Sequence, residues 1–268
     1  MKQPHVRALS NDLLTEPPHP FIDFSQAPAK QFQLDGFDCL IEARMLTAKP
    51  TPHFEDAETA RLAIDPQLRA WETRLEIDEA IRATFRYRGA DIVDLDPSTD
   101  PNVIYGSAVI ATDTATLHAT ASVSRHYQEY PSPATVPFVS TPTVLAVLGY
   151  LREWREGRSR LLAAAYLIYG RLARDFDPGS GRGRDQRAAA AMNVDGRVFS
   201  KLGTLAARND PIHGRKESQN PNPLTPAEIA WVEAATKLLV ARAGEVAVSS
   251  SRALPPLPLI TLAQLPHI

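Results

Sequence analysis

The first half of the chain alternates between apolar and polar positions with a period of two, which is typical of strands that bury one face. This pattern predicts strands over residues 37–45, 71–77, 83–89, 103–111 and 117–127. In the first strand we expect the side chains of Phe37, Cys39, Ile41, Ala43 and Met45 to point inward, and in the third those of Ala83, Phe85 and Tyr87. Residues 56–64 are expected to form a short helix. Five strands without a long helix between them indicate an antiparallel sheet.

The period changes after residues 130–142, a stretch with four prolines that is typical of a domain boundary. Beyond it the apolar spacing predicts helices over residues 141–157, 159–176, 187–208 and 225–247, with an interruption near residues 193–196. Thr141 is expected to cap the first helix, with Pro142 at its first position. Thr225 and Glu228 have the spacing of a capping box at the start of the last helix.

These patterns predict an α+β fold with an N-terminal antiparallel sheet domain over residues 1–138 and a C-terminal helical bundle over residues 141–250. An apolar, proline-rich tail follows over residues 251–268. Its prolines exclude a regular helix, so it is expected either to pack along its own domain or a partner, or to stay extended.

The charge is distributed unevenly between the two halves. Residues 1–140 carry a formal charge of −8 and residues 141–250 a charge of +5, within a total of −2. A basic second half favours an anionic partner for the helical domain, although such asymmetry is also common without function.

The remaining composition excludes several kinds of site. Cys39 is the single cysteine, which excludes an internal disulfide and a cysteine-rich zinc site. No metal-ligand set and no cofactor fingerprint is found, so neither a metal nor a cofactor is expected. The longest apolar run, residues 161–172, is shorter than the roughly 20 residues that a bilayer requires. We therefore expect a soluble, cytoplasmic protein that does not enter a membrane.

The stretch LAARNDPIHGRK, residues 205–216, contains the most informative motif. Arg208 is followed by Asn209, and four residues separate Arg208 from His213, which precedes Gly214. This motif, placed before a capped last helix, resembles the signature of the HEPN superfamily of helical domains over about residues 141–247. The resemblance implies a metal-independent endoribonuclease or RNA-binding protein of the kind found in defence or stress systems, which forms a homodimer.

The chemistry of such cleavage suits the residues of the motif. His213 would take the proton of the substrate's own 2′-hydroxyl, because its pKa lies naturally near neutrality. Arg208 would stabilise the charge that builds on the phosphoryl oxygens, and Asn209 would either orient one of these two residues or bind a phosphate oxygen. Arg182, Arg184, Arg215 and Lys216 are the candidate RNA-binding residues. Two residues depart from what catalysis favours: Pro211 lies inside the motif, and Asp210 brings a negative charge to an anionic substrate.

A structural interpretation of the same stretch stays open. Arg208 could hold the last carbonyls of the preceding helix or pair with a carboxylate, and Asn209 and Asp210 are ordinary turn formers. Asp210 could also cap a short helix that begins at Pro211. If the motif has a structural role only, the helical domain would be a non-catalytic module for dimerisation or protein interaction. The basic loop over residues 179–187 could add to an RNA-binding surface or be a flexible linker.

Overall fold

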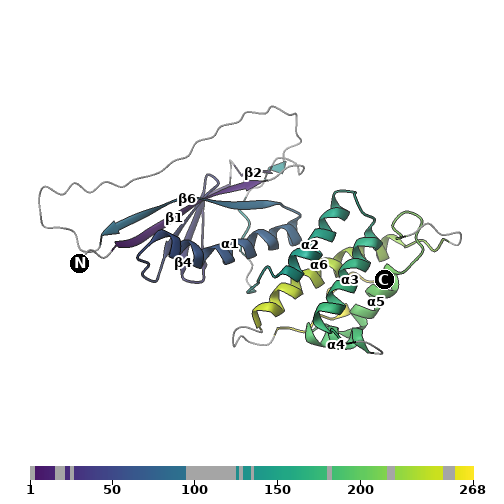
Figure 1. The fold of residues 1–268 in the computed structure, drawn as a ribbon. Helices are drawn as coiled ribbons and strands as arrows, with labels where there is room; N and C mark the ends of the chain where they lie inside the picture. Colours follow the sequence, from purple (N-terminus) through teal and green to yellow (C-terminus); the bar gives the residue numbers. More distant parts are fainter. Residues whose placement is uncertain are drawn as a thin grey trace, which may run out of the picture. The chain divides into compact units, whose positions relative to one another are not determined.

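The computed structural model describes residues 4–15, 22–24, 27–94, 125–126, 129–133, 136–179, 183–215, 221–249 and 257–268 (Figure 1). The chain divides into two compact units, residues 1–135 and residues 136–268. The predicted strand over residues 103–111 lies outside the described residues, as does that over residues 117–127 apart from residues 125–126.

The first unit contains a five-stranded antiparallel sheet with the strand order β3-β4-β5-β1-β6. Its strands are β1 (Pro4–Thr15), β3 (Lys30–Leu34), β4 (Phe37–Glu42), β5 (Met45–Pro50) and β6 (Ala83–Asp94). A separate short parallel pair joins β2 (Ile22–Asp23) to β7 (Arg125–His126). The second unit, which follows the sheet in the chain, consists of helices. The predicted α+β class with an antiparallel sheet is therefore confirmed.

Two strand predictions need correction in detail. Residues 37–45 form a hairpin rather than one strand, because Ala43 and Arg44 both adopt positive φ, as the tightest two-residue hairpin turns require. Phe37, Cys39 and Ile41 are buried as expected, but Ala43 in the turn and Met45 beyond it are exposed, Met45 by 38%. Tyr87, expected to point inward, is also 38% exposed; it pairs with Asn11 immediately before a register shift between β1 and β6.

The predicted strand over residues 71–77 is wrong, because these residues belong to the helix α1 (Ala57–Glu79), which is also much longer than the short helix expected over residues 56–64. Asp56 caps this helix by accepting a hydrogen bond from the Thr59 backbone N–H. Trp71 and Leu75 are buried on the helical stripe that packs against the sheet in the core of the first unit. Spacing by four residues, rather than by two, therefore governs this stretch.

The second unit is built from helices. They are α2 (Pro142–Arg155), α3 (Leu161–Phe176), α4 (Arg184–Ala191), α5 (Gly196–Ala206) and α6 (Pro226–Ser249). Thr141 caps α2 with its side chain, and Thr225 and Glu228 exchange hydrogen bonds at the start of α6, as predicted. The break between α4 and α5 falls where the interruption was expected. None of the described helices is both long enough and apolar enough to cross a bilayer.

The end of the chain packs on the second unit. Ile260 forms a parallel bridge with Val194 and is buried, and a short 3-10 helix, η1 (Leu262–Gln264), follows. Asn193 donates its side-chain amide to the Leu257 carbonyl, and the buried Arg242 of α6 donates to the Pro258 carbonyl at 2.8 Å. Residues 257–268 therefore pack along their own domain, which is one of the alternatives that the sequence left open for the tail.

Candidate functional site

Residues 207–215 form the turn that follows α5, and backbone hydrogen bonds fix it at both ends. The Leu162 N–H, in the first turn of α3, donates to the His213 carbonyl at 3.0 Å. The Asn222 N–H donates to the Asn209 carbonyl at 2.8 Å. His213 is thereby placed at the N-terminal end of α3, and Asn209 beside the approach to α6.

Asp210 organises the interior of this turn. It is only 2% exposed, and its carboxylate accepts hydrogen bonds from the backbone N–H groups of Ile212, His213 and Leu224. Burial acts to raise the pKa of this carboxyl group, but the three donors outweigh it and hold the pKa below its ordinary value. The charge expected to repel an anionic substrate is thus held inside the turn. Of the alternatives open for Asp210, a short helix beginning at Pro211 does not form, and residues 211–213 are a turn that the Asp210 carboxylate caps.

Gly214 closes the turn, and no other residue fits its position. Its N–H donates to the Asp210 carbonyl at 2.9 Å. A Cβ atom on Gly214 would lie 2.2 Å from that same carbonyl oxygen, well inside van der Waals contact. The glycine of the motif is therefore required by close packing of the backbone within the turn.

Arg208 forms an ion pair with Glu228 across the turn. Its Nη1 lies 2.7 Å from the Glu228 Oε2, with the two side chains 28% and 17% exposed. The Thr225 N–H also donates to that carboxylate, and this donor, together with Arg208, holds the pKa of Glu228 below its ordinary value although burial opposes it. The positive charge of Arg208 is therefore balanced by a carboxylate, which is one of the roles that the structural interpretation gives to this residue.

The other two motif residues are more accessible. Asn209 is exposed, and only its backbone carbonyl is engaged, with the Asn222 N–H, among the bonds that the structure describes. His213 is half-buried. Ile212, between the turn's proline and this histidine, is 72% exposed. The turn thus presents an imidazole, an amide and an apolar side chain to its surroundings.

Two arginines lie beside His213 at the start of α3. The Arg160 Nη1 donates to the Gly214 carbonyl at 3.3 Å. The Arg215 guanidinium carbon lies 3.7 Å from the centroid of the Tyr166 ring. Both arginines are exposed, and neither forms an ion pair within the described part of the chain. As far as the described residues go, positive charge without a carboxylate partner is thus concentrated next to the histidine.

The rest of the predicted RNA-binding set does not join this group. Arg184 donates its Nε to the Ala173 carbonyl at 3.3 Å, near the far end of α3. Ala173 follows Leu162 by eleven residues, which corresponds to about 16 Å along a helix axis. Arg182 and Lys216 lie outside the described residues. Of the four candidates, Arg215 is the one that the structure places beside His213.

Sequence reasoning missed three residues of this region, namely Arg160, Tyr166 and Glu228. Arg160 is separated from Gly214 by 54 positions, so no local motif joins them. In the structure Arg160 is the N-cap of α3 and makes no side-chain capping bond there. A cation at the positive end of a helix dipole is unfavourable by about 0.3–1 kcal/mol, which marks the position as unusual.

No protein family, curated protein or solved structure that was compared with this chain matches it. The likeness to HEPN domains therefore depends on the motif and its setting alone. Among the described residues, no three His, Cys, Asp or Glu side chains come together as metal ligands would.

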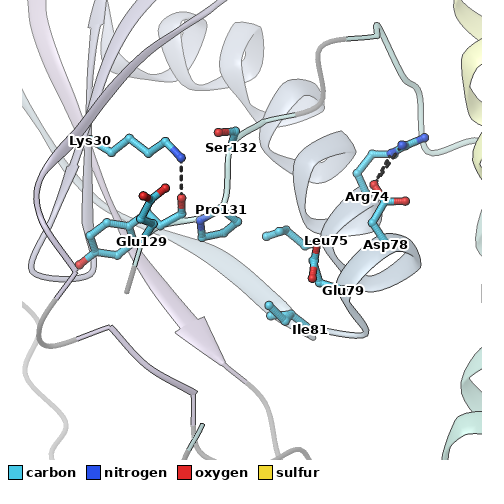
Figure 2. A pocket seen from close by; sticks show the side chains of 10 residues that line it. Lys30, Arg74, Leu75, Asp78, Glu79, Ile81, Glu129, Pro131 and Ser132 are labelled. Carbon is cyan, nitrogen blue, oxygen red and sulfur yellow. Dashed lines mark hydrogen bonds and ion pairs between the residues drawn. The ribbon is translucent and has the colours of Figure 1, made fainter. Parts of the chain in front are cut away.

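The first unit contains a cavity of about 430 Å³ between the end of α1 and residues 129–132 (Figure 2). The Lys30 Nζ donates to the Tyr130 carbonyl at 2.7 Å on one side, and Arg74 pairs with Asp78 at 3.0 Å on the other. The remaining lining residues are Leu75, Glu79, Ile81, Glu129, Pro131 and Ser132. Its charges are of both signs, so the cavity favours no single class of ligand.

Proposed function

We propose that the helical unit binds RNA through a surface formed by Arg160, Asn209, His213 and Arg215, called the turn surface below. One observation supports this most directly: the exposed guanidinium groups of Arg160 and Arg215 lie at the Gly214 end of the turn, beside His213, without an ion pair in the described residues. Guanidinium groups suit phosphate, because their fixed fork of donors matches two phosphate oxygens.

The position of the turn surface at the start of α3 supports binding of an anion. The helix begins with an arginine as its N-cap, so a cation is added to the end of the helix that already carries partial positive charge. A phosphate group placed there would offset the repulsion among these charges. RNA is the anion that the HEPN resemblance implies, and we propose it on that ground.

Cleavage is the finer part of the proposal. His213 would act as the base toward a 2′-hydroxyl, with no metal required. Arg208 is charge-balanced by Glu228, so we expect it to stabilise the transition state less than an unpaired arginine would. Arg160 and Arg215, at the Gly214 end of the turn, would also contribute positive charge that stabilises the transition state. Asn209, being exposed, is available to orient the substrate.

Binding is tested with a fluorescent single-stranded RNA titrated over a range of salt concentrations. Replacing Arg160 and Arg215 by Gln should weaken binding and reduce the slope of log Kd against log salt by about 0.7 for each lost phosphate contact. Arg184→Gln is the matched control: it removes the same charge near the other end of α3 and should leave the slope unchanged. A slope unaffected by the Arg160 and Arg215 changes would contradict the proposal.

Cleavage is tested in excess chelator with RNA and with DNA of the same sequence. RNA should be cut and DNA should survive, because only RNA provides the 2′-hydroxyl. His213→Ala should abolish cleavage while leaving the circular dichroism spectrum unchanged. Persistent cleavage by the His213→Ala protein would refute the assigned base, although RNA binding could still stand.

The second candidate is a non-catalytic protein-interaction or dimerisation module. Two observations favour it: Arg208 is engaged with Glu228, and Ile212 exposes an apolar side chain at the turn. Under this function Arg208→Ala lowers the melting temperature, and no version of the protein binds or cuts RNA. The homodimer implied by the resemblance stays a prediction, which sedimentation at tens of micromolar tests (a range suited to weak association).

A further inference from the structure

We infer that Tyr166 is a base-stacking residue of the turn surface and that Arg215 covers its ring until RNA binds. This inference rests on the proposed RNA binding and adds to it a residue outside the Arg208–His213 motif. In the absence of RNA, the guanidinium group of Arg215 lies over the ring, with its carbon 3.7 Å from the ring centroid. The arrangement joins an aromatic ring, a cation without an ion pair in the described residues, and a histidine at one end of α3.

The position of Tyr166 on its helix brings it close to His213. Tyr166 follows Leu162 by four residues, and Leu162 is the residue whose N–H donates to the His213 carbonyl. Residues four apart lie on the same side of a helix, about 5–6 Å from each other at their Cβ atoms. A nucleotide whose sugar or phosphate reaches His213 therefore has an aromatic ring within reach of its base.

The ring is accessible for such contact. Tyr166 is 38% exposed, whereas Tyr169, on the next turn of the same helix, packs against Phe199 and donates its hydroxyl to Asp185. The structure describes no hydrogen bond for the Tyr166 side chain. The two tyrosines thus differ: among the described residues, Tyr169 has an aromatic contact and a hydrogen bond, whereas the ring contact of Tyr166 is with Arg215.

The contact between Arg215 and Tyr166 is one that RNA can replace. A base stacked on an aromatic ring contributes more to binding than an exposed cation–π pair contributes to stability. A guanidinium group also binds phosphate through two parallel charge-assisted hydrogen bonds, which are stronger than its contact with a ring. When RNA binds, Arg215 therefore moves to a phosphate group and a base takes its place over Tyr166. Both groups gain a stronger partner in one exchange.

The experiment compares two polyanions on the full chain: a 12-nucleotide oligouridylate and an inorganic polyphosphate of similar length, which has no bases. Tyr166→Leu keeps an apolar side chain on the helix but removes the ring. It should weaken oligouridylate binding by about 5- to 150-fold, the range measured for the loss of one stacked base. Polyphosphate binding should stay within about twofold, because it involves no stacking. Tyr166→Phe keeps the ring and should bind both polyanions as the unaltered protein does.

Two further variants complete the comparison. Leu167→Ala removes an exposed apolar side chain next to Tyr166, and it should change neither affinity. Arg215→Gln should weaken both polyanions, because it removes a phosphate contact.

The outcomes separate the inference from the proposed function. Equal loss of oligouridylate and polyphosphate in Tyr166→Leu would mean that the ring only holds Arg215 in place, and would overturn the inference. Unchanged binding of both polyanions in Tyr166→Leu would overturn it as well, while leaving RNA binding by the turn surface intact. If the unaltered protein binds neither polyanion, the proposed function itself fails and the inference fails with it.

Discussion

Replacing Asp210 by Asn tests whether one buried carboxylate holds the turn together. In the folded protein one carboxylate oxygen accepts from the Ile212 and His213 N–H groups, and the other accepts from the Leu224 N–H at 2.6 Å. Asparagine has nearly the same shape but a single acceptor oxygen. If that oxygen keeps the first two donors, the amide NH₂ group faces the Leu224 N–H. Both groups are donors, so the buried Leu224 N–H is left without an acceptor.

The expected cost follows from these contacts. A buried N–H left without an acceptor costs about 1–3 kcal/mol. The two retained hydrogen bonds become neutral, and each then loses about half of its strength. Relief from burying a charge offsets part of this loss. We therefore expect Asp210→Asn to lower the free energy of unfolding by about 2–4 kcal/mol and the melting temperature by about 6–20 °C.

Thermal unfolding followed by circular dichroism measures the loss of stability. Amide hydrogen exchange of peptides containing Ile212, His213 and Leu224 shows whether the loss arises at this turn. Exchange should accelerate in these peptides before any others. Glu233→Gln is the matched control, because it removes one carboxylate from α6 that has no hydrogen bond in the described residues, and it should change stability by less than about 0.5 kcal/mol. Unchanged melting together with unchanged exchange in Asp210→Asn would refute the role of Asp210.

The same carboxylate makes stability depend on pH. Because three backbone donors outweigh burial, the pKa of Asp210 is lower in the folded state than in the unfolded state. The stabilisation is therefore fully present above the unfolded pKa, about 3.9, and is lost as the pH falls through the folded-state value. The difference in urea midpoint between the unaltered protein and Asp210→Asn should accordingly shrink between pH 7 and pH 3. A difference that grows on acidification would contradict this sign.

Two further predictions concern close packing. Gly214→Ala places a methyl group against the Asp210 carbonyl and should destabilise the protein by more than about 2 kcal/mol in urea unfolding. Its control is Gly170→Ala, where an added Cβ meets nothing within 4 Å, and this change should stabilise the protein by about 0.5–1 kcal/mol. Ile260→Ala should lower the free energy of unfolding by about 2–5 kcal/mol, because Ile260 is buried where the tail bridges Val194. Leu259 is exposed, so Leu259→Ala should lower it by less than about 0.5 kcal/mol. Equal effects within either pair would contradict the packing described here.

The sequence predicted best what local patterns determine. Thr141, and Thr225 with Glu228, combine a cap with a long apolar stripe, and both helix starts were found where expected. Residues 71–77 misled because Trp71 and Leu75 satisfy a period of two and a spacing of four at once. The cap at Asp56 and the unbroken helical stripe that follows it decide between these two patterns.

The candidate site was predictable only where it is local. Arg208, Asn209 and His213 are close in sequence, so their proximity follows from the chain itself. Arg160 and Tyr166 reach the turn from another helix, and no spacing rule connects residues so far apart. The burial of Asp210 was not predictable, because a sequence does not show which backbone N–H groups will surround a carboxylate.

The strand order of the first unit has a consequence for how the sheet assembles. β1 lies between β5 and β6 and is antiparallel to both, so α1 carries the chain from one side of β1 to the other. β3, β4 and β5 can pair through short hairpins, but β1 has to find residues 45–48 and residues 83–94, which are distant in sequence. The loop-closure entropy of these pairings makes β1 the slow part of the sheet to form. Until β1 is in place, β5 keeps an unpaired edge open to pairing with another chain.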